Sequence, residues 1–153
     1  MNTYEDLASL EEFRPTFLVN AADKSPLLPM ALDYYSKNTG IPYVALSVGT
    51  LSGYWGPIVV PGMTKCLQCY QTEELQQMSE DEIYIYEHFN ETIKGSFGPT
   101  NTITSTFASM DIIHYVAGEL ALCKSLGRRC TYDFREGIII TDSLPTEVCG
   151  CWS

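Results

Sequence analysis

The sequence has little positive charge. Nine Lys and Arg stand against 19 Asp and Glu, which gives a formal net charge of −10 at pH 7. Nucleic acids and anionic membrane surfaces are bound through clusters of Lys and Arg, so this balance argues against both partners. Charged residues of both signs reach only 18% of the chain, against about a quarter in ordinary proteins. This shortage predicts a surface that is covered by a partner or by another part of the same fold.

Long apolar runs are also missing. No uninterrupted run approaches the roughly 20 residues that a transmembrane helix needs, and Met1–Asp6 has neither the basic nor the apolar region of a signal peptide. We therefore predict a cytoplasmic protein. Disulfides are rare in the cytoplasm, so the six cysteines are interpreted as metal ligands or unpaired thiols. A length of 153 residues and a hydrophobic content of 45% predict a single folded domain over residues 1–153.

The cysteines are not evenly distributed. Cys66 and Cys69 form one close pair and Cys149 and Cys151 form another, with 79 residues between the pairs. Zinc binds four thiolates tetrahedrally, and two short loops can each present two of them, so the pattern predicts one structural zinc site. Buried thiols without metal, and a thiol-redox or metal-transfer protein, are the alternatives. The two other cysteines, Cys123 and Cys130, are predicted to be buried and inert.

The first half of the chain predicts an α/β fold. The apolar run Thr16–Ala22 is typical of a buried strand, a helix is expected from Ser25 to about Asn38, and Ile41–Val48 is a second buried strand. A strand, a helix and a strand in this order form a right-handed crossover unit with parallel strands. Ile58–Val60 is predicted as a third strand.

Further elements follow from similar patterns. Tyr4–Phe13 predicts a short amphipathic helix, Thr102–Val116 an apolar helix for a core or a subunit interface, and Cys130–Phe134 with Gly137–Thr141 a pair of strands. Residues 71–93 contain seven acids and neither Lys nor Arg. This segment is interpreted as solvated surface or, alternatively, as a lid or docking surface for a basic or peptide partner. Tyr54 and Trp55 are predicted to contribute to docking.

Four stretches together resemble the ThiF/MoeB/HesA family, whose relatives activate ubiquitin and ubiquitin-like proteins. The resemblance is carried by a strand that ends at an Asp, a G-I-P-Y strand, the approach to the first cysteine pair, and a G-P-T-N turn before an apolar helix. These stretches are Phe17–Asp23, Gly40–Val44, Gly56–Cys69 and Gly98–Asn101. Their order and spacing agree across nearly the whole chain, although each stretch alone would be a weak signal.

The resemblance implies a Rossmann-like, mostly parallel sheet with crossover helices, a zinc knuckle and a homodimer. It also implies an adenylyltransferase that uses ATP and magnesium to activate the C-terminal carboxylate of a ubiquitin-like protein or peptide. Asp23 matches the family residue that meets magnesium and the phosphates, and a cap for the following helix is the alternative role. The family usually has two residues inside the second cysteine pair, whereas this chain has only Gly150, which we expect to permit a tighter loop.

The family's nucleotide-binding loop, G-x-G-x-x-G, does not occur in this sequence. The resemblance therefore covers the C-terminal half of the family domain, with residues 70–98 as its crossover segment. A fragment, one half of a split enzyme completed by a separate N-terminal half, and a degenerate relative kept for binding all fit. Gln71–Gly98 contains no cysteine, so we expect adenylation without an enzyme thioester. The alternative function is a non-catalytic, zinc-stabilised module for dimerisation or peptide docking.

Overall fold

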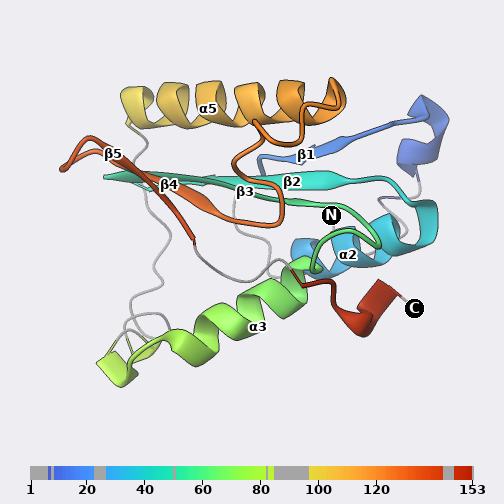
Figure 1. Cartoon of the computed structure of the whole chain (residues 1–153), viewed down its shortest axis with the longest axis horizontal. Coiled ribbons are helices and arrows are strands. Elements are labelled where there is room, and N and C mark those ends of the chain that lie inside the picture. The colour runs from blue at the N-terminus through green and yellow to red at the C-terminus, as the bar shows by residue number, and fades with distance from the viewer. Residues whose placement is uncertain are drawn as a thin grey trace.

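The computed structural model describes residues 7, 9–22, 27–49, 51–81, 83–84, 97–142 and 147–152. A five-stranded sheet in the order β1-β2-β3-β4-β5 lies at its centre (Figure 1). The strands are β1 (Leu18–Asn20), β2 (Tyr43–Val48), β3 (Ser52–Val59), β4 (Cys130–Asp133) and β5 (Ile138–Thr141). The helices are η1 (Ser9–Phe13), α2 (Leu28–Thr39), α3 (Leu67–Gln77), α5 (Gly98–Val116) and η2 (Gly150–Trp152), where η marks a 3₁₀ helix.

The predicted crossover unit is confirmed. Strands β1 and β2 pair in parallel, with Leu18 opposite Tyr43, and α2 connects them. Helix α2 turns Leu32 and Tyr35 into the core, where they are 4% and 0% exposed. The helix ends at Gly40, whose φ of 73° lies in the left-handed region that glycine adopts without a Cβ clash.

The prediction of a mostly parallel sheet is wrong for the residues described. Only β1 and β2 are parallel, whereas β2–β3, β3–β4 and β4–β5 are antiparallel pairs. The connections explain the difference, because residues 49–51 are the whole link between β2 and β3 and residues 134–137 are the whole link between β4 and β5. Parallel neighbours need a crossover of about a dozen residues, so such short links can join only antiparallel strands. The α/β class stands, with a mixed sheet.

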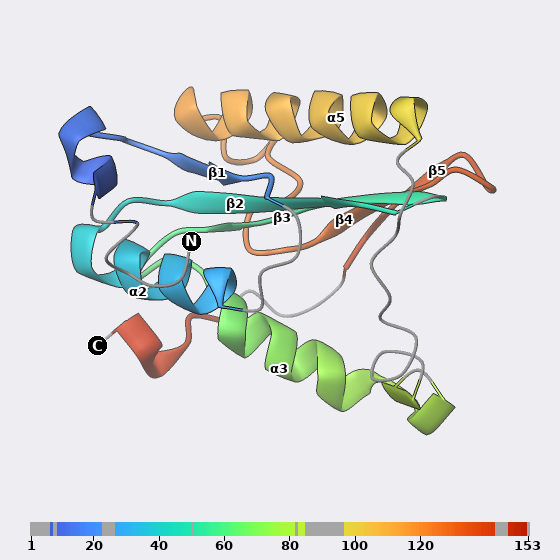
Figure 2. The same cartoon turned by 180° about the vertical axis from the view of Figure 1, so that it is seen from behind.

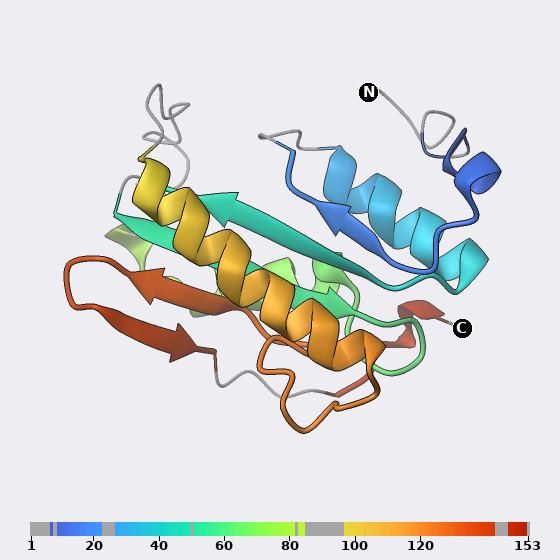
Figure 3. The same cartoon turned by 90° about the horizontal axis from the view of Figure 1, so that it is seen from above.

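Helices cover the sheet on both faces. Figure 2 shows α2, α3 and η2 together on one face, and Figure 3 shows α5 lying across the other face above β2 and β3. Helix α3 is held against the sheet by Tyr70, whose hydroxyl donates to the Asp142 carboxylate beyond β5. The same hydroxyl accepts a hydrogen bond of 3.1 Å from the backbone N–H of Arg129. The first cysteine pair therefore lies at the start of a firmly attached helix.

Helix α5 begins earlier than predicted, at Gly98 rather than Thr102, with Pro99 in the first turn where a missing N–H costs nothing. The buried side chains of α5 are either small or polar, and they include Thr104 and Ala108. On its outer face Ile113 and Val116 are 64% and 68% exposed. The buried face agrees with the predicted packing against the core, and the predicted subunit interface stays a prediction. No helix among the described residues combines the length and the apolar character that crossing a membrane requires.

Trp55 lies in the core rather than on a docking surface. It is 1% exposed, its ring stacks on Phe107 with 5.5 Å between the centroids, and its indole N–H donates to Asp111 at 2.9 Å. The prediction that Trp55 contributes to docking is therefore wrong, although this residue lies in the glycine-rich stretch of residues 49–56. That stretch instead forms most of β3, which is central in the sheet and therefore covered on both faces. Near the N-terminus, the helix predicted for Tyr4–Phe13 appears among the described residues chiefly as η1.

Candidate metal centre

The structure brings the four predicted cysteines together. Cys66 precedes the first residue of α3 and Cys69 lies in its first turn, while Cys149 and Cys151 come from the C-terminal segment that ends in η2. Their four Sγ atoms all lie within 4.8 Å of one another. The clustering predicted from the two close pairs is thus confirmed, across a sequence separation that only the folded chain can close.

The cluster has dimensions that suit a tetrahedral metal ion such as zinc. Zinc–sulfur bonds of about 2.3 Å at tetrahedral angles place sulfur atoms about 3.8 Å apart. The Sγ atoms of Cys69 and Cys151 are separated by 3.5 Å, and the remaining sulfur pairs lie within the 4.8 Å limit. Small side-chain rotations are therefore enough to accommodate an ion. Four thiolates would leave no open coordination position, so the metal would stabilise the fold rather than take part in chemistry.

Backbone N–H groups already point at the sulfurs. The Cys66 N–H donates to the Cys149 Sγ at 3.3 Å and the Cys69 N–H to the Cys66 Sγ at 3.5 Å. Burial raises the pKa of Cys66 well above its usual range and that of Cys69 to about 11. Burial also opposes ionisation of Cys149, but the N–H groups of Cys66 and Cys151 outweigh it and lower the pKa. A metal must therefore displace protons from at least Cys66 and Cys69 at neutral pH.

A buried carboxylate supports the first cysteine loop. Asp33 on α2 is 7% exposed, and its Oδ1 accepts from the Tyr43 hydroxyl at 2.5 Å and from the Leu67 N–H at 3.0 Å. Its Oδ2 accepts from the Gln68 N–H at 2.9 Å. These two N–H groups open α3 and have no partner within the helix, so Asp33 caps it from another element. The sequence pattern did not predict a role for Asp33, because in sequence it is only an acidic residue next to the buried positions of α2.

The second cysteine loop is held by three contacts of its own. The Lys37 ammonium on α2 donates to the Cys151 carbonyl at 2.8 Å. The Trp152 indole N–H donates to the Thr64 carbonyl at 2.6 Å, and the Cys149 Sγ accepts the Cys66 N–H. Gly150 has a φ outside the left-handed region, and a Cβ there would meet nothing within 4 Å. Gly150 therefore permits this tight loop without using the backbone angles that are particular to glycine, so the 3₁₀ turn of η2 is open to other residues as well.

The two other cysteines do not belong to the cluster. Cys123 and Cys130 are 7% and 0% exposed, and burial raises the pKa of each thiol to about 11, as expected of inert cysteines. Asp23 lies outside the described residues, so its predicted contact with magnesium and phosphate stays a prediction. Within the acid-rich segment, residues 71–77 belong to α3, and most of residues 82–93 lie outside the described part.

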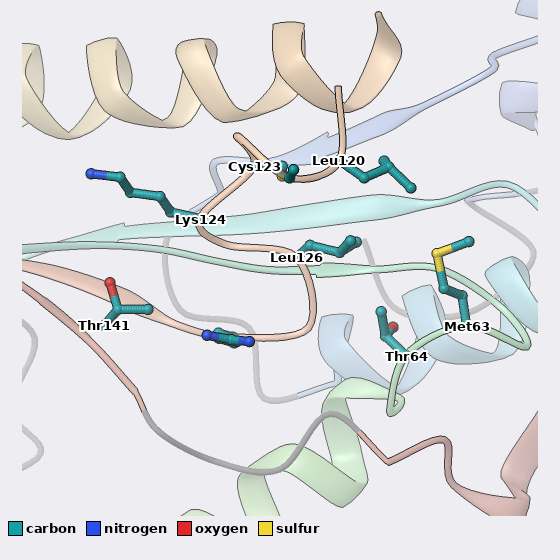
Figure 4. Close-up of a pocket in the computed structure, with 9 residues that line it drawn as sticks. Met63, Thr64, Leu120, Cys123, Lys124, Leu126 and Thr141 are labelled. Carbon is teal, nitrogen blue, oxygen red and sulfur yellow. The ribbon is translucent and has the colours of Figure 1, made fainter. Parts of the chain in front are cut away.

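A separate hollow lies between the segment after α5 and the segment that leads from β3 to α3 (Figure 4). It has a volume of about 600 Å³, and Met63, Cys123, Lys124 and Arg128 are among the residues that line it. None of the four clustered cysteines contributes to its wall. The hollow and the metal centre are therefore two different places on the molecule.

Comparison with known proteins shows what this fold is similar to. No protein-family profile matches the sequence, and no curated protein does. Among solved structures, E. coli MccB with ATP is 23% identical with a TM-score of 0.72, and the match covers 99% of this chain and 41% of that one. E. coli MccB with MccA is 21% identical with the same TM-score and coverage. PaaA is 15% identical with a TM-score of 0.58, over 88% of this chain and 45% of that one.

The match to this chain covers only 41% of the MccB chain. Identities of 21–24% demonstrate a common fold and no more. MccB is described as a microcin C7 biosynthetic enzyme, and the fold that it shares with this chain agrees in part with the fold expected from the sequence. The chain therefore has the fold of a portion of MccB, with a four-cysteine cluster that can hold a metal ion.

Proposed function

We propose that this chain is the zinc-bearing portion of an ATP-dependent adenylating fold that acts on the C-terminal carboxylate of a peptide or a ubiquitin-like protein. The observation that carries the proposal is the match of nearly the whole chain to part of MccB, a microcin C7 biosynthetic enzyme. The clustered cysteines agree with it, since the sequence resemblance implied zinc at those four positions.

The proposed substrate class follows from the same comparison. MccB has been solved with ATP and with MccA, including N-formylated MccA. In the proposed reaction a carboxylate oxygen of the substrate attacks the α-phosphorus of ATP. The bond from that phosphorus to the bridging oxygen breaks, pyrophosphate leaves, and an acyl-adenylate forms. Magnesium would neutralise the phosphates, and the zinc would take no part in this step.

The proposed nucleotide side of the fold is the edge where β1 and β2 end. Ligands of open α/β sheets bind outside the carboxyl ends of the parallel strands, and these two strands are the parallel pair here. Asp23 follows the last residue of β1, Asn20, by three positions. A carboxylate at that edge suits magnesium, which supports its proposed role.

A second candidate is a non-catalytic module for dimerisation or peptide docking. The observation that favours it is the absence of G-x-G-x-x-G from the sequence, because that loop supplies the backbone N–H groups that hold phosphate. Homodimerisation is proposed for either function. The exposed Met110, Ile113 and Val116 on α5 form apolar surface that a second copy would cover. Sedimentation velocity of the purified chain at several concentrations tests this point.

Calorimetry with Mg-ATP tests the adenylation proposal. Saturable binding that is lost in Asp23→Ala and kept in Glu136→Ala would support adenylation, because Glu136 is an exposed acid in the β4–β5 turn, away from the β1 edge. Absence of binding by the unaltered chain would leave a fragment, a split subunit that needs its N-terminal half, or a docking module, and the same instrument would then test a peptide with a free C-terminal carboxylate. Metal analysis should find one zinc per chain, and Cys66→Ser should remove it.

A further inference from the structure

We infer that α2 is a template for the metal centre: Asp33 positions the first cysteine loop and Lys37 positions the second. The inference rests on the proposed zinc site and concerns residues that do not touch the metal themselves. The two residues are one helical turn apart, so they lie on the same face of α2. Each contacts a different cysteine loop, although 79 residues separate the loops in sequence.

The Asp33 contacts determine where α3 begins. Its two carboxylate oxygens accept from the N–H groups of Leu67 and Gln68, and the Tyr43 hydroxyl on β2 fixes the carboxylate from the sheet side. Leu67 and Gln68 lie between the two cysteines of the first pair. Shifting their N–H groups would shift the separation and direction of the Cys66 and Cys69 sulfurs. Asp33 is therefore a positioning residue for two of the four proposed ligands.

Lys37 acts on the other pair. Its ammonium donates to the Cys151 carbonyl at 2.8 Å, and Cys151 provides an Sγ 3.5 Å from that of Cys69. A zinc ion with four thiolates carries a net charge of −2, so a nearby ammonium also favours it electrostatically. A single helix thus contacts both halves of the site, and it aligns the two cysteine loops when the metal is bound.

The charge of Asp33 opposes its positional effect. The Asp33 carboxylate accepts from the N–H of Leu67, the residue after Cys66, and a negative charge so close to Cys66 disfavours its thiolate. Asp33→Asn distinguishes the two effects. The amide has nearly the same shape but must turn its NH₂ group toward one of the three donors that Asp33 now satisfies. If position dominates, zinc binding weakens, and if charge dominates, zinc binding tightens.

Outer contacts that orient metal ligands typically change metal affinity about 10- to 100-fold. We therefore expect Asp33→Asn to raise the zinc dissociation constant about 10-fold or more, measured by competition with a chromophoric chelator. Lys37→Met should raise it by a smaller factor, about threefold, because Cys151 is exposed and water can replace the ammonium at its carbonyl. The absorption of the cobalt-substituted protein reports whether the tetrahedral geometry is kept in each variant.

The chain provides matched controls. Asp111 on α5 is also buried, at 5% exposure, and also accepts from one aromatic side chain and two successive backbone N–H groups, those of Lys124 and Ser125. These three hydrogen bonds go to Trp55, Lys124 and Ser125, none of which belongs to a cysteine loop. Asp111→Asn should lower stability and leave the zinc dissociation constant within about twofold of the unaltered protein's value. Lys124→Met is the corresponding control for loss of a positive charge.

Each outcome decides between proposals. An unaltered protein that binds no zinc refutes the metal site and the inference with it. Tight zinc binding that is unchanged or strengthened in Asp33→Asn refutes the template role alone. Equal weakening in Asp33→Asn and Asp111→Asn would refute it too, since general destabilisation would then be the cause. Should Asp33→Asn fail to fold, Lys37→Met against Lys124→Met decides the question.

Discussion

Removal of the metal is predicted to detach the C-terminal segment and lower the thermal stability of the whole chain. The proposed zinc joins Cys69 to Cys149, which lies 80 residues further along the chain, and so closes a loop of that length. The chain-entropy treatment of a cross-link gives about 15 cal/mol/K for a loop of this length, or about 4.5 kcal/mol at 25 °C. A domain of about this size loses about 2–4 °C of melting temperature per kcal/mol, which predicts a fall of about 9–18 °C.

The remaining contacts are too weak to keep the segment in place. The hydrogen bonds of residues 147–152 to the body of the protein include those from Trp152 to Thr64, from Lys37 to Cys151 and from Cys66 to Cys149, besides the 3.5 Å contact between the Cys69 and Cys151 sulfurs. Each contributes about 1 kcal/mol, and the half-buried Trp152 adds about 1–2 kcal/mol. Ordering six residues costs about 6–12 kcal/mol. This entropic cost is larger than the summed energy of the contacts, so residues 147–152 should detach from the body of the protein when the metal is removed.

Hydrogen exchange read by mass spectrometry, with and without a strong chelator, tests this reasoning. We expect exchange in residues 147–152 to approach that of an unstructured peptide after chelation, while β2 and β3 remain protected. The melting temperature, followed by circular dichroism, should fall in the same samples. If metal analysis confirms that zinc has been removed and neither the exchange nor the melting temperature changes, the metal does not hold the segment and the argument fails.

Three further predictions concern the core. Cys123 and Cys130 should resist alkylation by iodoacetamide at pH 8 until the protein is unfolded, because burial raises the pKa of both thiols from 9.0 to about 11. Because the pKa of these thiols is higher in the folded protein than in the unfolded chain, they contribute fully to the free energy of unfolding below pH 9. This contribution is lost as the pH rises to about 11, and urea unfolding across that range will measure the loss. Asp111→Ala should cost about 3 kcal/mol in the same assay, since three buried donors lose their acceptor. Gly53→Ala should also destabilise, because a Cβ would lie 1.7 Å from the Thr104 Oγ1, and Thr104→Ala should partly restore stability.

The local pattern of the sequence was enough for several elements. The crossover unit of β1, α2 and β2 follows from two short apolar runs around a helix that ends at Gly40, and the structure confirms it. The β4–β5 hairpin follows in the same way from two short strand patterns, Cys130–Phe134 and Gly137–Thr141, with Arg135 and Glu136 between them. The pairing of the two cysteine loops was also predictable, because a metal site needs four ligands and only these two close pairs were available.

Tertiary structure alone decided which residues surround those elements. The sheet is mixed because short links force antiparallel pairing, and Trp55 is buried because β3 lies at the centre of the sheet. Asp33 looks like any surface acid in sequence and becomes a helix cap only because α2 packs beside the start of α3. Periodicity reports which face of an element is apolar, but not which distant backbone groups a polar side chain will meet. The cysteine ligands were therefore visible in the sequence, whereas the residues that position them became visible only in the fold.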